Sequence, residues 1–181
     1  MREDIERVLY TEEQIQQRVN ELGAELTRDF GDKNPIFLGV LKGCFVFMSD
    51  LIRRFDAPCA LDFMAVSSYE GTSSTGAVRI TKDLSQDIHG RHVIIVEDIL
   101  DTGITLGYLK KYLQNREPAS ITLCTIFDKP ERRKVDISAD YVGLTVPNAF
   151  VVGYGLDYNE KYRNLPYLGI LKPEIYKKDK E

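Results

Sequence analysis

The segment from Val93 to Leu106 places the strongest limits on what this chain can fold into. Its sequence, VIIVEDILDTGITL, begins with a short apolar run that is typical of a strand buried on both faces of a sheet. This strand is expected to end at two adjacent acids, Glu97 and Asp98. A third acid, Asp101, then precedes a Thr-Gly turn that opens a helix. A buried strand that leads through a short turn into a helix indicates an α/β fold.

The rest of the chain alternates helical patterns with apolar strands. The clearest helix is predicted over 12–30, where apolar residues recur at helical spacing and Thr11 with Gln14 fits a capping box. Continuous apolar strands that alternate with helices predict a mostly parallel, twisted sheet flanked by helices. Further helices are predicted over 45–55 and 105–115, and strands over 36–41, 60–66, 78–81, 92–96, 121–127, 141–146 and 150–153.

Length and composition limit the class of protein. The chain has 181 residues, which predicts a single domain over residues 1–181. Its net charge of −4 argues against broad, charge-driven binding of nucleic acid. No apolar run approaches the roughly 20 residues of a membrane helix, and the charged first residues do not resemble a signal peptide. The three widely spaced cysteines are typical of free thiols in a reducing compartment, so we expect a cytoplasmic protein without a membrane partner.

The residue types between Glu97 and Thr105 indicate the ligand. Ligands of open α/β sheets bind beyond the carboxyl ends of the strands, and the N–H groups at a helix N-terminus form a phosphate cradle. The acids repel phosphate but suit sugar hydroxyls or a bridging magnesium ion. A ribose 5-phosphate with a metal ion fits these features together. The alternative without a ligand is an apolar strand followed by a solvated acidic turn.

The segment VEDILDTGITL resembles the phosphoribosyl-pyrophosphate motif of the type I phosphoribosyltransferases. This resemblance implies the fold of that family, with a small hood built from the terminal segments. The resemblance to the hypoxanthine-guanine branch implies transfer of the 5-phosphoribosyl group from phosphoribosyl pyrophosphate to N9 of a 6-oxopurine, which yields IMP or GMP and pyrophosphate. The segments that resemble this branch are Leu41–Gly43, Ser68–Tyr69, Lys129–Pro130 and Phe150–Glu160, followed by Arg163.

The resemblance gives the carboxylates distinct roles. It makes Asp101 the general base, which accepts a proton at purine N7 as N9 attacks. Glu97 and Asp98 hold the ribose hydroxyls and bind magnesium, the implied cofactor, and Asp157 helps to bind a second magnesium ion. The structural alternative for Asp101 is an N-cap of the following helix.

Three parts of the chain are implied to bind phosphate groups. The turn before the helix binds the 5′-phosphate, and a loop after an early strand binds pyrophosphate together with an arginine. In the family, the Leu41–Lys42 peptide of this loop is expected to be cis. The residues concerned are Thr102, Gly103 and Thr105 for the 5′-phosphate, and Lys42, Gly43 and Arg163 for pyrophosphate.

The base is implied to meet three residues. Lys129 donates to the purine O6 and rejects adenine, which carries a donor at that position. Phe150 stacks on the purine ring, and Val151 offers backbone groups to its edge. The structural alternatives are a solvated surface lysine and a core aromatic residue.

The polar segment 67–77, SSYEGTSSTGA, is predicted to be a flexible loop. We expect it to act as a lid that excludes water from an oxocarbenium-like transition state. Ser68 and Tyr69 would then contact pyrophosphate or ribose. A passive surface connection is the alternative for this segment.

The family resemblance also implies that the chain assembles as a homodimer or homotetramer.

Two other functions remain open for this fold. One is an RNA-binding regulator, similar to the pyrimidine-operon attenuation proteins, against which the net charge of −4 argues. The other is a xanthine or pyrimidine phosphoribosyltransferase, which shares the phosphate motif. Only the residues at the base end argue against that second alternative.

Overall fold

Helices and strands alternate along most of the chain, as the sequence predicts. The computed structural model describes residues 1–68 and 78–177, without the side chain of Ser68. Its elements are β1 (Ile5–Tyr10), α1 (Glu12–Phe30), β2 (Ile36–Leu41), α2 (Phe45–Ile52), β3 (Ala60–Ser68), β4 (Val78–Lys82), β5 (His92–Leu100), α3 (Ile104–Gln114), β6 (Ser120–Asp128), β7 (Tyr141–Thr145), β8 (Val151–Val152), β9 (Leu168–Leu171) and α4 (Pro173–Lys177), with short 3-10 turns at Arg2–Asp4 and Pro130–Arg132.

The central sheet has the strand order β4-β3-β2-β5-β6-β7. All neighbouring strands are parallel except β4, which runs antiparallel to β3. The predicted mostly parallel sheet is therefore confirmed. Because β2 and β5 pair in parallel, from Ile36 opposite Val93 onward, the loops that follow their carboxyl ends lie at the same end of the sheet.

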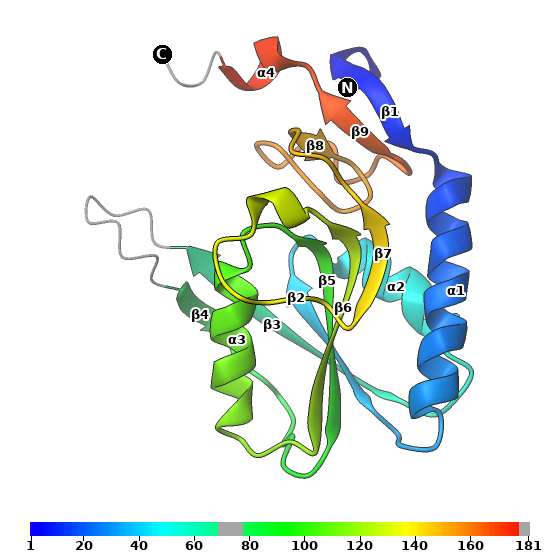
Figure 1. Ribbon diagram of the computed structural model, residues 1–181, viewed down its shortest axis with the longest axis vertical. Coiled ribbons are helices and arrows are strands. Elements are labelled where there is room, and N and C mark those ends of the chain that lie inside the picture. Colours follow the sequence, from blue (N-terminus) through cyan, green and yellow to red (C-terminus); the bar gives the residue numbers. More distant parts are fainter. Residues whose placement is uncertain (69–77, 178–181) are drawn as a thin grey trace.

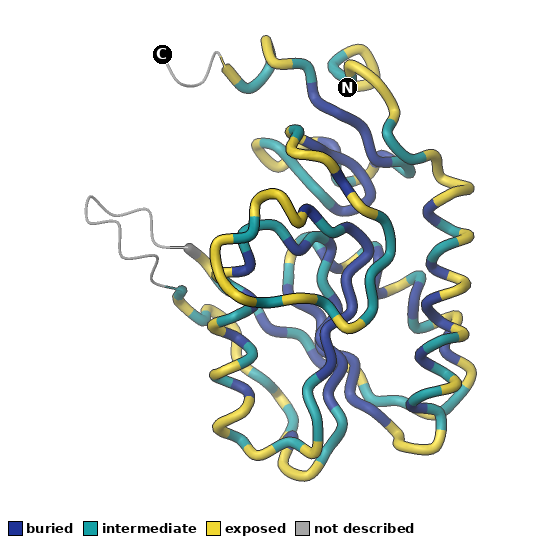
Figure 2. Tube along the Cα trace, viewed as in Figure 1, coloured by how far each residue is buried: buried dark blue, intermediate teal, exposed yellow. Residues whose placement is uncertain are grey.

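Helices cover both faces of this sheet (Figure 1). Alternate residues of β5 point to opposite sides, so Ile94 packs in the cluster formed with α1 and α2, while Ile95 packs in the cluster formed with α3. The tube in Figure 2 is accordingly dark along the central strands. This two-sided burial explains why the strand is a continuous apolar run rather than an alternating one.

The strand that carries the acids is longer than the sequence predicts. The predicted strand ends before Glu97, whereas β5 continues to Leu100. Its ladder with β6 extends to the pair Leu100 and Asp128, so neighbouring backbone, and not the polarity of the side chains, determines where the strand ends. Glu97 and Asp98 therefore lie inside the sheet. The second helix also ends earlier than predicted, at Ile52.

A small second sheet is built from both ends of the chain. β1 pairs antiparallel with β9, and β9 pairs antiparallel with β8. Figure 1 shows this sheet with α4 at one end of the molecule. It forms the hood that the family resemblance implies. No helix in the described ranges is long and apolar enough to cross a membrane.

Candidate active site

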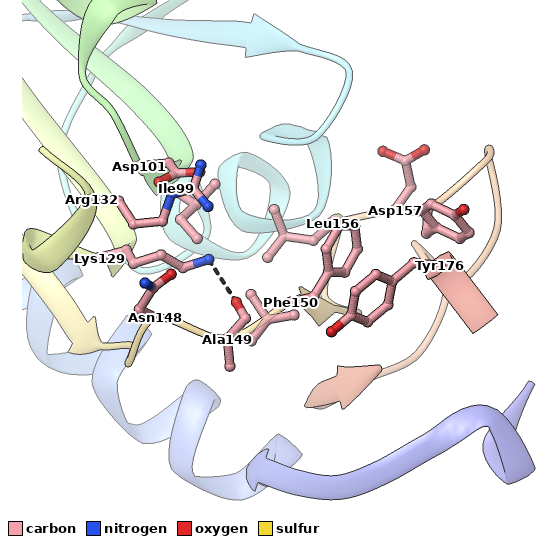
Figure 3. A pocket seen from close by; sticks show the side chains of 12 residues that line it. Ile99, Asp101, Lys129, Arg132, Asn148, Ala149, Phe150, Leu156, Asp157 and Tyr176 are labelled. Atoms are coloured by element: carbon pink, nitrogen blue, oxygen red, sulfur yellow. Dashed lines mark hydrogen bonds and ion pairs between the residues drawn. The ribbon is translucent and has the colours of Figure 1, made fainter. Parts of the chain in front are cut away.

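Two adjoining pockets lie where β5 meets the hood. The first, which we call the acid pocket, has a volume of about 310 Å³ and contains the carboxylates of β5 and the turn before α3. The second, the aromatic pocket, has a volume of about 690 Å³ and is lined by Lys129, Phe150 and Tyr176 among others (Figure 3). Ile99, Asp101 and Asp157 line both pockets. One continuous site therefore offers a polar half and a half suited to a planar ring.

The acid pocket contains two adjacent buried carboxyl groups. Asp98 is 7% exposed, and Oε2 of Glu97 is fully buried without a hydrogen-bond partner. Burial and the neighbouring Asp98 raise the pKa of Glu97 well above its usual range. Burial also raises the pKa of Asp98 to about 6, although a hydrogen bond from the Ile99 amide and the charge of Arg163 oppose the shift. Two such groups favour a ligand that donates hydrogen bonds or carries positive charge.

The loop after β2 packs tightly against these carboxyls. A Cβ on Gly43 would lie 1.6 Å from Oδ2 of Asp98, so only glycine lets the backbone come this close. The carbonyl of Gly43 in turn lies against Gly155, which has a positive φ of 100°. The Leu41–Lys42 peptide is cis, as the family resemblance implies. The backbone of this loop therefore forms one wall of the acid pocket.

The turn before α3 is held by glycine and not by a capping side chain. Gly103 is the N-cap of α3, with φ 80° and no side-chain cap. Asp101 is thus not the N-cap, which corrects the structural alternative for that residue. The hydroxyl of Thr102 accepts a hydrogen bond from the Ile104 amide at 3.4 Å. The first turn of α3, with Thr105, lines the acid pocket. The free N–H groups at this helix N-terminus favour an anion.

An arginine and an aspartate from the hood close the acid pocket. Arg163 Nη2 lies 2.8 Å from Oδ1 of Asp157, and Nη1 donates to the carbonyl of Gly155 at 2.8 Å. Both charged side chains are largely buried, at 21% and 28% exposed, so they do not form an ordinary surface pair. The Nε of Arg163 is buried without a partner, which leaves one donor for a ligand.

A buried lysine occupies the inner end of the aromatic pocket. Lys129 is 6% exposed, and its Nζ donates to the carbonyl of Ala149 at 2.8 Å. Burial lowers its pKa from the usual value. The alternative of a solvated surface lysine is therefore wrong. An ammonium group with one protein partner retains further protons to donate to a ligand.

Two arginines near this lysine were missed by the sequence analysis. Arg132 Nε lies 3.0 Å from Oδ1 of Asp101, but Oδ1 is buried without receiving a hydrogen bond. Arg133 donates to the carbonyls of Leu100 and Asp101 and pairs with Asp128. Arg133 thereby clamps the end of β5 to β6. The only sequence signal was the run of basic residues after Pro130, which is also typical of a solvated surface.

Most of the predicted site residues come together in these pockets. The segment 69–77 with Tyr69, and the side chain of Ser68, lie outside the described residues. The acid pocket is lined by Lys42, Gly43, Glu97, Asp98, Thr102, Gly103, Thr105 and Arg163, together with Asp101 and Asp157. The aromatic pocket is lined by Lys129, Phe150 and Val151, together with the same Asp101 and Asp157.

The acid pocket does not hold a metal ion with protein ligands alone. Within the described ranges, no group of three or more His, Cys, Asp or Glu side chains could bind a metal ion. The buried, unpartnered Oε2 of Glu97 nevertheless fits a cation. Magnesium is often bound by one or two carboxylates, with water and substrate phosphates completing its shell. The residues therefore fit magnesium if a phosphorylated substrate supplies the other oxygens.

Comparisons with known proteins agree on the class of this chain. A family model for the phosphoribosyl transferase domain matches residues 8–159. The hypoxanthine-guanine phosphoribosyltransferase of Bacillus subtilis is 55% identical over 177 residues, which is 97% of this chain and 98% of that protein. The bifunctional protein TilS/HprT of Listeria monocytogenes is 54% identical over 97% of this chain, which corresponds to 27% of its own length. A solved hypoxanthine phosphoribosyltransferase from Staphylococcus aureus superposes with a TM-score of 0.94 at 55% identity, covering 97% of this chain and 96% of that one.

The fold is that of the type I phosphoribosyltransferases. Within that class, the chain belongs to the hypoxanthine-guanine phosphoribosyltransferase family. The predicted family, fold class and enzyme class are therefore confirmed.

Proposed function

We propose that this chain transfers the 5-phosphoribosyl group of phosphoribosyl pyrophosphate to N9 of a 6-oxopurine and releases pyrophosphate. The observation that carries this proposal is the position of Asp101, which lines both pockets. A carboxylate at this junction lies between a pocket for a phosphorylated sugar and a pocket for a planar base. Family membership at 55% identity over nearly the full length supports the same reaction.

The aromatic pocket binds and orients the purine. Lys129 Nζ donates a hydrogen bond to the 6-oxo group, and Phe150 stacks on the ring. Asp101 accepts the proton of N7 as N9 attacks the sugar, which raises the electron density on the attacking nitrogen. The position of Asp101, which lines the aromatic pocket together with Lys129 and Phe150, supports this role.

The acid pocket binds the sugar and its phosphates. Glu97 and Asp98 hold the ribose hydroxyls, and the negative charge nearby stabilises the positive charge that develops on the ring. The 5′-phosphate lies on the turn formed by Thr102, Gly103 and Thr105, at the N-terminus of α3. Lys42, Gly43 and Arg163 bind the departing pyrophosphate. The main contribution of the protein is positioning and electrostatic stabilisation.

Glu97 and Asp98 would hold magnesium, and Asp157 would help to hold a second ion. The bound ions would neutralise negative charge on the pyrophosphate group. The buried Oε2 of Glu97 supports this assignment.

The reaction with hypoxanthine or guanine is favoured over an RNA-binding regulator and over a pyrimidine enzyme. The Bacillus subtilis relative reported above is named for hypoxanthine and guanine. The buried Lys129 fits a 6-oxo group, whereas an RNA-binding regulator or a pyrimidine enzyme does not require this residue.

The enzyme acts in the cytoplasm, a location that its three free cysteines support because they are typical of a reducing compartment. It assembles as a homodimer or homotetramer.

Steady-state kinetics with four bases test the proposal. Hypoxanthine, guanine, xanthine and adenine are compared at saturating phosphoribosyl pyrophosphate and magnesium. We expect turnover with hypoxanthine and guanine and none with adenine. Calorimetry with phosphoribosyl pyrophosphate, with and without magnesium, tests the polar half separately. Absence of turnover with every 6-oxopurine, or no binding heat from the sugar donor, would contradict the proposal.

A further inference from the structure

A tyrosine near the C-terminus packs against the aromatic pocket. Tyr176 lies in α4, and its ring stacks on that of Phe150, with centroids 4.8 Å apart and ring planes 16° apart. Tyr176 also lines the pocket. In Figure 3 its ring lies on the other side of Phe150 from Lys129. The stack therefore covers one face of the Phe150 ring.

Other contacts limit where the Phe150 ring can lie. Tyr158 meets it edge-on, with centroids 5.4 Å apart and ring planes at 90°. The carbonyl of Phe150 accepts a hydrogen bond from the Leu171 amide at 2.9 Å, which links this residue to the end of β9 just before α4. Phe150 is nevertheless 39% exposed. Its ring is thus held by two aromatic neighbours, and its exposed part lines the aromatic pocket.

We propose that Tyr176 is a positioning residue of the base site, which holds the Phe150 ring in place for stacking on a planar heteroaromatic base. This inference rests on the proposed function, because it names a further residue of the same base site. A ring that is already held in place loses little side-chain freedom when the base binds, so more of the stacking energy contributes to affinity.

The effect is confined to the base half of the site. Tyr176 lines the aromatic pocket but is not among the residues that line the acid pocket. Its helix has no buried residue. Ile175 and Tyr176 both pack against the small cluster that contains Val152 and Leu171. Ile175 shares this anchoring contact but does not line the aromatic pocket, so it is the control for anchoring of the helix.

Initial-rate kinetics on Tyr176→Leu, Tyr176→Phe and Ile175→Ala test this inference. Hypoxanthine is varied at saturating phosphoribosyl pyrophosphate. Phosphoribosyl pyrophosphate is then varied at saturating hypoxanthine. We expect Tyr176→Leu to raise the KM for hypoxanthine about three- to tenfold, the range given by one aromatic pair. The KM for phosphoribosyl pyrophosphate and kcat should stay within about twofold of wild type. Tyr176→Phe should restore the wild-type KM, because it keeps the ring.

Three outcomes would overturn the inference. An unchanged or lower KM for hypoxanthine in Tyr176→Leu means that the tyrosine does not support the base, or that it obstructs the pocket. An equal rise in Ile175→Ala means that anchoring of α4 matters and the stack does not. A full rise in Tyr176→Phe assigns the effect to the hydroxyl group. A wild-type enzyme without any turnover contradicts the proposed function itself, whereas an active wild type with unaffected variants contradicts only the role of Tyr176.

Discussion

Arg132 Nε lies 3.0 Å from Oδ1 of Asp101, so a cation accompanies the carboxylate that lies between the two halves of the active site. The pair comes from two different elements, since Arg132 ends the 3-10 turn after Lys129 and Asp101 follows β5. Both side chains line the aromatic pocket. The arginine therefore helps to set where the proposed base lies before a purine enters.

Removal of this ion pair should reduce activity more than stability. We expect Arg132→Gln to lower kcat/KM for hypoxanthine about three- to tenfold, because Asp101 loses the neighbour that holds it. The pair is 45% and 38% exposed, so its loss should cost less than about 1 kcal/mol of folding free energy. Initial rates and urea unfolding measure the two effects. Lys134→Gln is the matched control, since Lys134 is exposed and lines neither pocket. Equal rates in the wild type and Arg132→Gln would show that the ion pair does not matter.

Asp101→Asn tests the general base directly. Asparagine keeps the shape of the side chain but cannot accept a proton at purine N7, so kcat should fall by about 10²-fold or more. Binding of phosphoribosyl pyrophosphate with magnesium, measured by calorimetry, should change little, because the phosphates contact other residues. Wild-type turnover in this variant would exclude Asp101 as the base.

The predictable part of the site followed from short sequence motifs, and the rest depended on long-range contacts. The acids of β5 and the turn before α3 are adjacent in the chain, so their chemistry could be interpreted from spacing. Arg132 could not be assigned, because its contact with Asp101 depends on how the turn after β6 packs against the end of β5. Tyr176 lies 26 residues after Phe150 in the sequence and gave no periodic signal.

In the fold, too, local sequence patterns predict some elements, and long-range contacts determine the others. The helices and the continuous apolar strands carry strong local patterns. β1 has mixed exposure and becomes a strand only because β9 supplies its hydrogen-bond partners. β9 in turn has four residues, too few for a clear pattern. Similarly, Glu97 and Asp98 do not end β5, because the adjacent β6 continues the ladder.

Gly43 should tolerate no side chain. A Cβ there would lie 1.6 Å from Oδ2 of Asp98, so Gly43→Ala must move either the loop after β2 or the carboxylate. We expect the affinity for phosphoribosyl pyrophosphate to fall at least about tenfold, with a loss of about 1–3 kcal/mol in stability from overpacking. Gly107→Ala in α3 is the control, since its Cβ would lie 3.7 Å from Val135 and alanine favours a helix. Calorimetry and urea unfolding give the two readouts, and unaltered binding in Gly43→Ala would contradict this tight packing.

Burial of Asp98 should make the enzyme less stable at high pH than it would otherwise be. The pKa of Asp98 is raised to about 6 from 3.8, so the folded state binds this proton more tightly than the unfolded state. Stability therefore falls as the pH rises from about 4 to about 6 and stays lower above that range. We expect Asp98→Asn, which cannot ionise, to be more stable than wild type at pH 8 by on the order of 3 kcal/mol, with no gain near pH 3.5. Phosphoribosyl pyrophosphate binding should be weakened in the same variant.

Asp29 provides the control of opposite sign. A hydrogen bond from Arg28 and another from Tyr141 lower the pKa of Asp29 to about 2, so its ionised form stabilises the fold above about pH 4. Asp29→Asn should therefore be less stable than wild type at pH 8, where Asp98→Asn is more stable. Thermal unfolding of the three proteins at pH 4 and pH 8 measures both differences. If Asp98→Asn were destabilised at pH 8, the site carboxylate would contribute to folding, and its retention would need no functional explanation. If it is stabilised, the wild type keeps a destabilising carboxylate in β5, as expected where the ligand and not the fold requires the charge.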